Sequence, residues 1–590
     1  MMQNQAEPVF QRLWQAIKRG LTALVKSPVF YIYLVAVVIY LPWFFPNLSE
    51  IAPWDETYYI ISGRNMLDGQ LPDLAYGPLL SLFYMITSLP FLNSPFWLIH
   101  ANSLGRFLLF TLPFVGTWQI ARVFKDRYRP VVLFGFLFVS PFLTQNFEYP
   151  ADLLFAALSA AALAQAVQFL QTKKLSHVWW ASFWLGLGML TRGDALIIIL
   201  ALTVLVVWAG LKHQPWWRLV LASLLPFLAL TVGYVLVRGV VTGDFDSGMS
   251  SRSYTAFEQG QEVAMPDADA RFGAPTESYY VARELFGTPE ENEYSVFRAI
   301  ARNPQAYFIR LKAVLQTLPG LFLTAYHRRY AIILAFFALR GVIALIREKK
   351  YLLVLLLAVW VLPLSAGIAR TLVRVGYFRL FYFVLFSLAI IGLKALLESF
   401  RKNAEGLVWA GVFGLVLVLA VVFDQPGIQM SATVFLCWLL LAYLLSGSAD
   451  KYPGWQAMAM LLLLAGAYLL RTGEVVFSPR RLGEEPREAA ALALQEVTEP
   501  DAKVLTCTPS VVFLANREVA NFCGADIPEF ASSEDFIAWM RSQDFSTIFL
   551  ERSSPAVLAD LVFDQRGKAL TQVFASGGGE AYILVLEPEN

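Results

Sequence analysis

Long apolar runs, separated by short polar segments, make up most of the chain. A helix needs about 20 apolar residues to cross a hydrocarbon layer about 30 Å thick. Thirteen runs come close to this length, so the pattern predicts an all-α polytopic membrane domain with about thirteen transmembrane helices. They cover residues 30–45, 100–124, 131–144, 153–170, 178–190, 195–211, 216–241, 330–346, 351–368, 378–397, 408–423, 433–445 and 455–470.

A further apolar run, residues 79–92, decides the orientation of the chain. If this run crossed the membrane, every later segment would change sides. If it does not cross, the basic clusters between the spans fall on the cytoplasmic side together with the N-terminus, as the positive-inside rule requires. The run is short for a span and has a proline near each end. We therefore interpret it as a juxtamembrane or re-entrant helix on the outer side.

The two ends of the chain are more polar than its middle. Residues 1–29 are basic and amphipathic and predict a cytoplasmic segment that leads into a transmembrane domain over residues 30–472. Residues 473–590 predict a small soluble α/β domain, which lies on the outer face with the long loops 46–99 and 242–329. Its predicted helices cover residues 486–497, 510–515, 532–543 and 555–562, and its strands 503–506, 518–522, 547–550, 570–575 and 581–586.

Composition narrows the class of function. The 590 residues are 57% hydrophobic and 15% charged, and the mean hydropathy of +0.55 is typical of a multi-pass membrane protein. A net charge of +1 gives no basic field for nucleic acid. The four histidines are scattered without ligand spacing, so the sequence assigns no metal site.

Charged residues on the outer side contrast with this apolar background. Asp55 and Glu56 follow the first predicted span, and Glu148 and Asp152 form a second acidic pair at the start of a later one. The positive-inside bias disfavours basic residues on this side. The basic residues that nevertheless lie there include Arg192, Arg370, Arg374 and Arg379.

Short motifs around these charges resemble the outer loops of one enzyme class. They are Pro53-Trp54-Asp55-Glu56-Thr57-Tyr58-Tyr59, Tyr76-Gly77-Pro78, Asp152-Leu153-Leu154, Gly186-Leu187-Gly188-Met189-Leu190-Thr191-Arg192-Gly193 and Arg374-Val375-Gly376-Tyr377-Phe378-Arg379-Leu380. The motifs are similar to those of GT-C glycosyltransferases, the class of the protein O-mannosyltransferases and the lipid A aminoarabinose transferases. The latter typically carry Lys-Pro-Pro where this chain has Tyr76-Gly77-Pro78, which leaves the donor sugar open.

The resemblance implies an inverting transfer of a sugar from a polyprenyl (undecaprenyl or dolichyl) phosphate. The reaction would take place at the outer face of the inner (plasma) membrane, with a lipid, polysaccharide or protein as acceptor. Asp55 would accept the acceptor's proton. Glu56 would have an orienting role or support a divalent cation, and the sequence leaves open whether the reaction uses such a cation as a cofactor. The four outer arginines would bind the donor phosphate, with Arg192 and Arg379 as the preferred donors. Residues 242–302 would order over the phosphate. The residues expected to bind substrate are Arg64, Tyr58, Tyr59, Tyr76, Glu148, Asp152 and Tyr377.

Several of these residues also have a purely structural interpretation. Asp55 and Glu56 suit the first turn of a helix. Arg64 lies on roughly the same helical face as Glu56 and would neutralise it. Arg192 can pair with Asp194 at a tight turn.

An alternative function also stays open. Arg374 and Arg379 can serve as interfacial anchors at lipid headgroups, and a lipid-linked saccharide transporter or flippase would share the apolar composition. Such a protein would be expected to place ionisable groups near the bilayer midplane, in paired repeats. Here the charges gather on one face, which favours the transferase.

Two cysteines lie in the predicted outer domain. Cys507 and Cys523 flank two of its predicted elements, in what the topology makes an oxidising compartment. A disulfide between them is compatible with this placement but not required. Cys437 lies inside a predicted span and is expected to be a free thiol.

Overall fold

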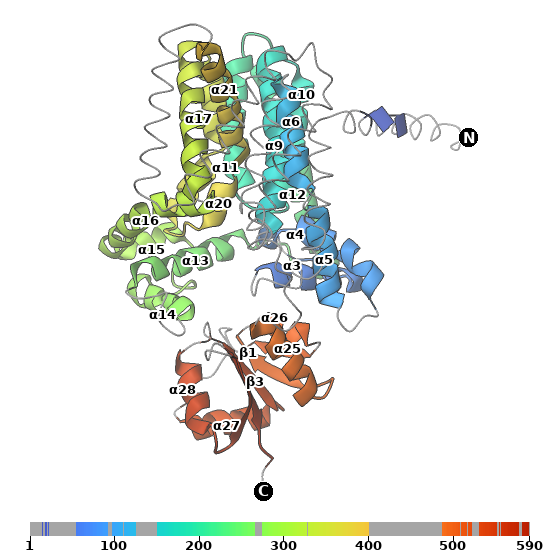
Figure 1. The fold of residues 1–590 in the computed structure, drawn as a ribbon, viewed down its shortest axis with the longest axis vertical. Helices are drawn as coiled ribbons and strands as arrows, with labels where there is room; N and C mark the ends of the chain where they lie inside the picture. The colour runs from blue at the N-terminus through green and yellow to red at the C-terminus, as the bar shows by residue number, and fades with distance from the viewer. Residues whose placement is uncertain are drawn as a thin grey trace, which may run out of the picture.

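The computed structural model combines a helical bundle, an outer layer of shorter helices and a C-terminal α/β domain (Figure 1). The structure describes residues 14–15, 18–19, 22, 55–72, 74–92, 97–109, 111–124, 150–265, 274–326, 328–380, 382–400, 486–507, 509–515, 517–521, 530, 532–551, 554, 556–576 and 581–588. The predicted spans at 30–45, 131–144, 408–423, 433–445 and 455–470 lie outside these ranges.

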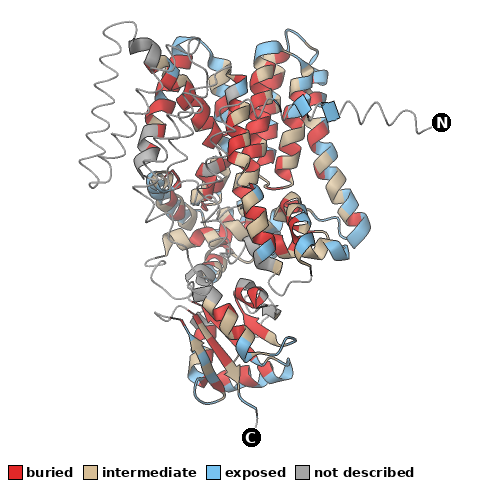
Figure 2. Cartoon of the chain, turned by 45° about the vertical axis from the view of Figure 1, so that its right-hand side comes forward, coloured by how far each residue is buried: buried red, intermediate tan, exposed pale blue. Residues whose placement is uncertain are grey.

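Apolar helices lying side by side form the bundle, and buried residues run along them and through the sheet of the C-terminal domain (Figure 2). The alanine-rich helix α9 is the most enclosed of the long apolar helices, with 72% of its apolar window buried, compared with 28% for α12. α9 therefore lies at the centre of the packing and α12 at its edge. The helices are α6 (Leu112–Val123), α9 (Pro150–Thr172), α10 (Leu175–Met189), α11 (Ala195–Gly210), α12 (Trp216–Thr242), α17 (Arg328–Arg347), α18 (Tyr351–Val359), α19 (Leu362–Ala369), α20 (Val375–Leu380) and α21 (Tyr382–Phe400).

Two glycines allow α17 and α21 to pack closely. A Cβ atom on Gly341 of α17 would overlap the carbonyl of Leu388, and one on Gly392 of α21 would overlap the carbonyl of Phe337. Small residues at a crossing let two backbones approach closely, which is a common packing device between membrane helices. α17 and α21 are thereby held as one unit.

Prolines divide two of the predicted spans. The span predicted over 100–124 is built from α5 (Trp97–Leu109) and α6, with Pro113 in the first turn of α6. The span predicted over 351–368 is built from α18 and α19, which are bent by 41°, with Pro363 in the first turn of α19. Proline starts a helix readily but cannot continue one, because it lacks the N–H group.

Three described helices are long and apolar enough to cross a membrane, namely α9, α12 and α16 (Pro304–Ala325), or four if the bent pair α18 and α19 counts as one. The thirteen-span count and the orientation remain predictions. α16 differs from expectation, because the sequence analysis placed its residues in the outer loop 242–329. In Figure 1 α16 lies beside α15, near the end of α17. Residues 79–92 form the short helix α4 (Pro78–Ser88) and a 3-10 turn, in keeping with a juxtamembrane segment.

A layer of helices, most of them short, lies at one end of the bundle and is called the outer layer here (Figure 1). Tyr254, Phe257, Phe286 and Ala299 are buried together and give the second half of this layer a small core of its own. An ion pair of 2.8 Å between Arg283 and the buried Glu258 joins two of its helices. The layer consists of α3 (Asp55–Asn65), α4, α5, α13 (Met249–Gln259), α14 (Ala274–Phe286), α15 (Val296–Arg302) and α16, with 3-10 turns at Met66–Asp68, Leu74–Tyr76, Leu89–Phe91 and Gly260–Ala264.

The C-terminal domain has the alternating elements that the sequence predicted. Its five-stranded sheet has the order β2-β1-β3-β5-β4, with β1 parallel to β2 and β3, and β5 antiparallel to β3 and β4. Ser532 caps α27 by accepting a hydrogen bond from the Asp535 N–H. The elements are α25 (Pro486–Val497), β1 (Lys503–Thr506), α26 (Pro509–Leu514), β2 (Glu518–Asn521), α27 (Ser533–Ser542), β3 (Thr547–Glu551), α28 (Ala556–Gln565), β4 (Leu570–Ala575) and β5 (Ala581–Leu586).

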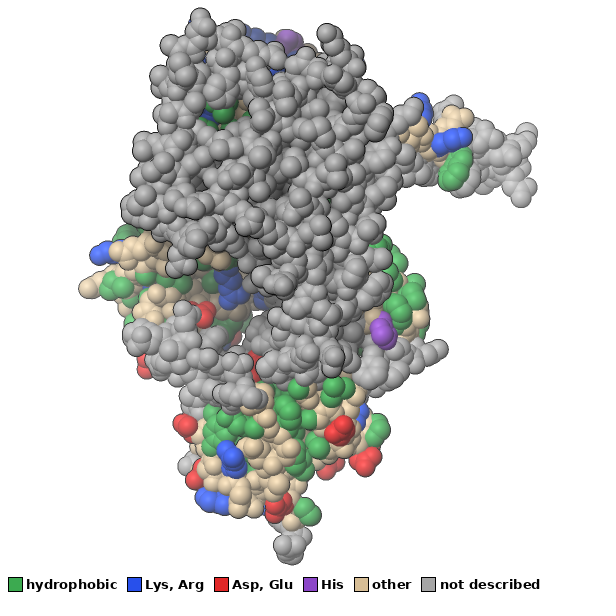
Figure 3. All heavy atoms as spheres, in the orientation of Figure 1, with side chains coloured by type: hydrophobic (Ala, Val, Ile, Leu, Met, Phe, Trp, Pro, Cys, Tyr) green, Lys and Arg blue, Asp and Glu red, His purple; other side chains and the backbone are tan. Residues whose placement is uncertain are grey.

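This domain is docked on the first half of the outer layer. Tyr59 of α3 and Tyr84 of α4 belong to the same cluster of buried apolar residues as Leu494 of α25 and Val511 of α26. On the face drawn in Figure 3, the domain exposes hydrophobic, acidic and basic side chains together. The domain is thus joined to this half of the layer by apolar packing, with α26 against α5.

Candidate functional site

Two outer turns meet beside the N-terminal end of α9. Gly77 adopts a left-handed conformation (φ 62°), and a Cβ atom there would lie 2.7 Å from the Thr191 carbonyl. The Leu79 N–H donates to the Leu190 carbonyl at 2.8 Å. Glycine at position 77 is needed both for its φ and for this close approach. The two motifs that contain Tyr76 and Arg192, far apart in sequence, are thus in direct contact.

Beside this contact lies an ion-pair cluster, defined as Asp152, Arg192, Asp194, Arg370 and Tyr377. Arg192 donates through Nε to Asp194 Oδ2 at 2.8 Å and through Nη1 to Asp152 Oδ1. Arg370 Nη2 lies 4.0 Å from Asp194 Oδ1 and donates to the Tyr377 hydroxyl at 3.3 Å. The Arg192 guanidinium also stacks 5.5 Å from the centre of the Tyr377 ring. The structure thereby brings together four of the predicted site residues.

Helix ends place the two carboxylates of the ion-pair cluster. Asp152 lies in the first turn of α9 and Asp194 at the N-cap position of α11, where the helix dipole favours negative charge. Gly376 makes room for Asp152, because a Cβ atom at this position would overlap the Asp152 carboxylate. Burial by itself lowers the pKa of the Arg192 guanidinium, but Asp152 and Asp194 together raise it well above its usual value.

The charges of the ion-pair cluster balance. Its two guanidinium groups face two carboxylates, whose side chains are only 5% and 6% exposed. Arg192 therefore has the pairing with Asp194 that the sequence analysis left open as its structural interpretation. A phosphate binding there would have to compete with two buried acids.

A second group, the tyrosine–arginine cluster, is defined as Tyr58, Tyr76, Arg252, Tyr279 and Arg374. The rings of Tyr58 and Tyr76 lie 4.4 Å apart at 30°, and Arg252 of α13 stacks 5.2 Å from the centre of the Tyr76 ring. The pKa of Tyr279 is raised by burial. A hydrogen bond from Gln259 and the nearby charges of Arg252 and Arg374 offset this rise in part. Arg374 is exposed and forms no ion pair with any side chain that the structure describes.

The sequence analysis missed Arg252 and Tyr279. Both lie in the predicted outer loop 242–329, where Arg252 runs against the positive-inside bias just as the four chosen arginines do. That bias does not single out Arg252, because the same loop also contains Arg271, Arg283, Arg298, Arg302 and Arg310. No sequence signal marked Tyr279, because its place depends on how α14 packs.

The acidic pair Asp55–Glu56 occupies the start of α3, one turn before Tyr58. This position suits the structural interpretation of a helix N-terminus and equally places the pair beside the tyrosine–arginine cluster. The side chains of Asp55 and Glu56 lie outside the described part of the structure, so their roles remain predictions. Arg64 stacks 5.6 Å from the centre of the Trp97 ring on α5.

Other predicted site residues have mixed outcomes. Tyr59 is buried against Gly77, its ring 3.4 Å from where a Cβ atom would lie. Glu148, the side chain of Arg379 and Cys523 lie outside the described residues. Cys507 is disulfide-bonded, and its pairing with Cys523 stays a prediction. Within the described ranges, no group of three or more His, Cys, Asp or Glu residues could hold a metal ion.

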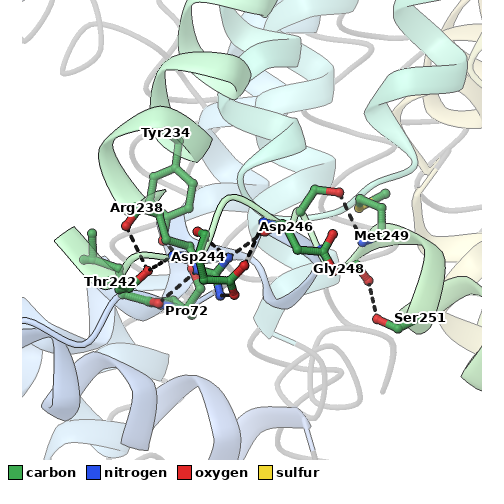
Figure 4. A network of polar contacts seen from close by, with 11 residues as sticks. Pro72, Tyr234, Arg238, Thr242, Asp244, Asp246, Gly248, Met249 and Ser251 are labelled. Atoms are coloured by element: carbon green, nitrogen blue, oxygen red, sulfur yellow. Dashed lines mark hydrogen bonds and ion pairs between the residues drawn. The ribbon is translucent and has the colours of Figure 1, made fainter. Parts of the chain in front are cut away.

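A network of hydrogen bonds and an ion pair at the end of α12 holds the segment that leads from α12 into α13 (Figure 4). The Tyr234 hydroxyl donates to the Pro72 carbonyl at 2.6 Å, and Arg238 pairs with Asp244 at 2.6 Å and donates to the Asp246 carbonyl at 2.6 Å. Asp246 then accepts from the Gly248 N–H at 3.1 Å, directly before α13. The segment that carries Arg252 is therefore anchored at its beginning to the loop that precedes Tyr76.

Solved structures with a similar fold are known. The structure aligns with that of ArnT from Cupriavidus metallidurans bound to undecaprenyl phosphate, with a TM-score of 0.50, 14% identity, and coverage of 95% of this chain and 99% of that one. ArnT from the same organism in the apo state aligns with a TM-score of 0.49 and 13% identity, over 97% of this chain and 100% of that one. A third similar structure is the oligosaccharyltransferase AglB from Archaeoglobus fulgidus in complex with an inhibitory peptide and a dolichol-phosphate. Its TM-score is 0.48 and its identity 14%, and the alignment covers 94% of this chain and 74% of that one. No protein-family model and no curated protein matches the chain by sequence. The chain thus has the GT-C fold that the motifs predicted.

Proposed function

We propose that the chain is an inverting glycosyltransferase that moves a sugar from an undecaprenyl or dolichyl phosphate to an acceptor at the outer face of the inner, or plasma, membrane. The observation that carries the proposal is the match over nearly the full length of both chains to ArnT bound to undecaprenyl phosphate. The convergence of the α3 start, Tyr76 and Arg252 at one end of the bundle supports it. The acceptor is a lipid, polysaccharide or protein, and the C-terminal domain docked beside α3 would cover the site or select that acceptor.

In the proposed reaction, an acceptor oxygen attacks the anomeric carbon of the sugar. A new carbon–oxygen bond forms as the bond between this carbon and the phosphate oxygen breaks, with inversion. The acceptor's proton passes to the Asp55 carboxylate, which must lie within hydrogen-bond reach of that oxygen. The leaving group is the polyprenyl phosphate, whose developing negative charge needs cationic donors in a poorly solvated place.

The arginines are unequal candidates for binding this phosphate. Arg192 and Arg370 face two buried carboxylates, whereas Arg374 is exposed and Arg252 lies on the face of Tyr76. We therefore assign the phosphate to Arg374 and Arg252, with Arg379 as a further candidate. Arg192 and Arg370 would support the site by holding the turns around it.

The donor class is tested by the lipid that copurifies with the protein. Mass spectrometry of the extracted lipid should detect a polyprenyl phosphate, either free or carrying one hexose or pentose. The Asp55→Asn variant should retain more of the sugar-bearing form, because transfer is blocked. Ordinary phospholipids alone, in both proteins, would count against the donor assignment. A sugar-bearing lipid of equal abundance in both would favour a flippase.

A further inference from the structure

Arg310 of α16 is a buried arginine that no described carboxylate pairs with. It is 1% exposed, and its guanidinium lies between two phenyl rings, 4.4 Å from the centre of Phe257 and 5.1 Å from that of Phe286. Its Nη2 donates to the Phe257 carbonyl and to the Thr371 hydroxyl, while Nε and Nη1 have no hydrogen-bond partner among the described residues. No acidic side chain in the described part of the chain forms an ion pair with it.

Packing alone does not account for this residue. Burying a cation with two unpaired donors is costly, and an apolar side chain of similar volume would fill the space between the rings without that cost. What a methionine could not provide is the pair of hydrogen bonds to Phe257 and Thr371. Those two bonds therefore indicate what Arg310 contributes.

The two hydrogen bonds join segments from both clusters of the site. Phe257 belongs to α13, two residues before Gln259, which bonds Tyr279 of the tyrosine–arginine cluster. Thr371 directly follows Arg370 and precedes Arg374 by three residues. Arg310 thereby connects the outer layer to the segment that carries these two arginines.

Thr371 needs such a support. It has a φ of 56°, a left-handed conformation that is unfavourable for a β-branched residue. A second tether comes from the same helix, where the Tyr307 hydroxyl donates to the Ala369 carbonyl at 3.1 Å. At Gly260, a Cβ atom would lie 2.7 Å from Arg310 Nη2 and 2.8 Å from the Thr371 carbonyl oxygen, so the contact requires a glycine there.

We propose that Arg310 is a positioning residue: it holds Thr371 in its left-handed conformation and so sets where Arg370 and Arg374 stand relative to α13. This inference rests on the proposed function, in which Arg374 binds the donor phosphate. Arg310 itself touches no substrate in this account. It acts through the backbone of residues 369–374.

The test compares Arg310→Met, Arg310→Lys and Thr371→Val in the full-length protein. The last variant keeps the shape of Thr371 but removes the hydroxyl that accepts from Arg310. Arg302→Met is the matched control, because Arg302 lies in the same layer and pairs with Glu291 at 2.7 Å, away from residues 369–374. Binding of undecaprenyl phosphate is measured for each variant, with and without Arg374→Ala.

Arg310→Met and Thr371→Val should each weaken binding about tenfold, and Arg310→Lys less, while Arg302→Met stays within about twofold. Added to Arg374→Ala, Arg310→Met should cause little further loss, because both changes disable the same interaction. Fully additive losses, or unchanged binding in Arg310→Met and Thr371→Val, would overturn the proposal.

Hydrogen exchange separates this inference from the proposed function. If the wild type fails to bind undecaprenyl phosphate, the donor assignment is wrong, but the positioning role can still be measured without ligand. Arg310→Met, or Thr371→Val where the first variant does not fold, should speed amide exchange in residues 257–260 and 369–374 only. Unchanged exchange there, or exchange that rises throughout the chain, would refute the positioning role.

Discussion

The ion-pair cluster and the tyrosine–arginine cluster both contain arginines, yet they differ in what surrounds the charge. Arg192 and Arg370 face two nearly buried carboxylates. Arg374 is exposed without an ion pair to any described side chain, and Arg252 is stacked on Tyr76. Neutralised arginines hold a fold together, whereas arginines on an aromatic or solvent-facing surface can meet an incoming phosphate. The comparison therefore separates arginines that support the fold from arginines that can bind the phosphate.

The largest expected difference concerns stability. Arg192→Met would leave Asp152 and Asp194 buried without their partner and should lower the free energy of unfolding by about 3 kcal/mol. Arg374→Met removes an exposed arginine and should change it by less than about 0.5 kcal/mol. Thermal unfolding of the two purified variants measures both values. Equal, small changes would erase the distinction between the clusters.

Gly376 gives a finer test of the ion-pair cluster. In Gly376→Ala the new methyl group would push the Asp152 carboxylate away from Arg192, at a cost of about 2 kcal/mol. Gly233→Ala in α12 is the matched control, since no described atom outside its own stretch of helix backbone lies within 4 Å of the added Cβ. That control should be neutral or slightly stabilising, because alanine favours helix more than glycine does. A Gly376→Ala protein as stable as the control would show that Asp152 is not held in place.

For affinity toward the lipid phosphate the order should be reversed, with Arg374 mattering more than Arg192. Arg374→Ala should weaken binding of undecaprenyl phosphate about tenfold, equivalent to about 1.4 kcal/mol. Arg374→Lys should recover only part of this, because lysine lacks the planar fork of arginine. Arg374→Ala that binds as tightly as the wild type would return Arg374 to the role of interfacial anchor.

Both clusters face the outer side only if the predicted orientation holds. A membrane-impermeant thiol reagent should label cysteines of the C-terminal domain in intact cells, but only after reduction, since Cys507 is disulfide-bonded. Cysteines that stay unreactive after reduction, and react once the inner membrane is permeabilised, would place the domain inside. The assignment of outward arginines would then fail as a whole.

The sequence predicted local features better than contacts between distant segments. Apolar runs marked α9, α10, α11, α12 and α17 closely, because burial in a bundle or lipid imposes a continuous apolar pattern. Alternating short patterns identified every described helix and strand of the C-terminal domain. The interruptions at Pro113 and Pro363 were less visible, since the apolar pattern continues across each break.

The site was predicted in part for the same reason. Motif resemblance selected Asp152, Arg192 and Tyr377, which the structure brings together. The sequence left open a pairing of Arg192 with Asp194, but it did not indicate that Asp152 would be a second partner. That contact depends on the packing of the turn after α10 against α9. Arg252 and Arg310 escaped notice because their partners lie far away in sequence.

The most direct test of the central claim is transfer by Asp55→Asn, measured together with lipid binding. The substitution keeps the size of the side chain and its hydrogen bonding but removes the base. We predict a loss of about 10²–10⁴-fold in sugar transfer, with undecaprenyl phosphate still bound, and a smaller loss for Glu56→Gln. A well-folded Asp55→Asn protein that transfers sugar at a near-normal rate would contradict the account.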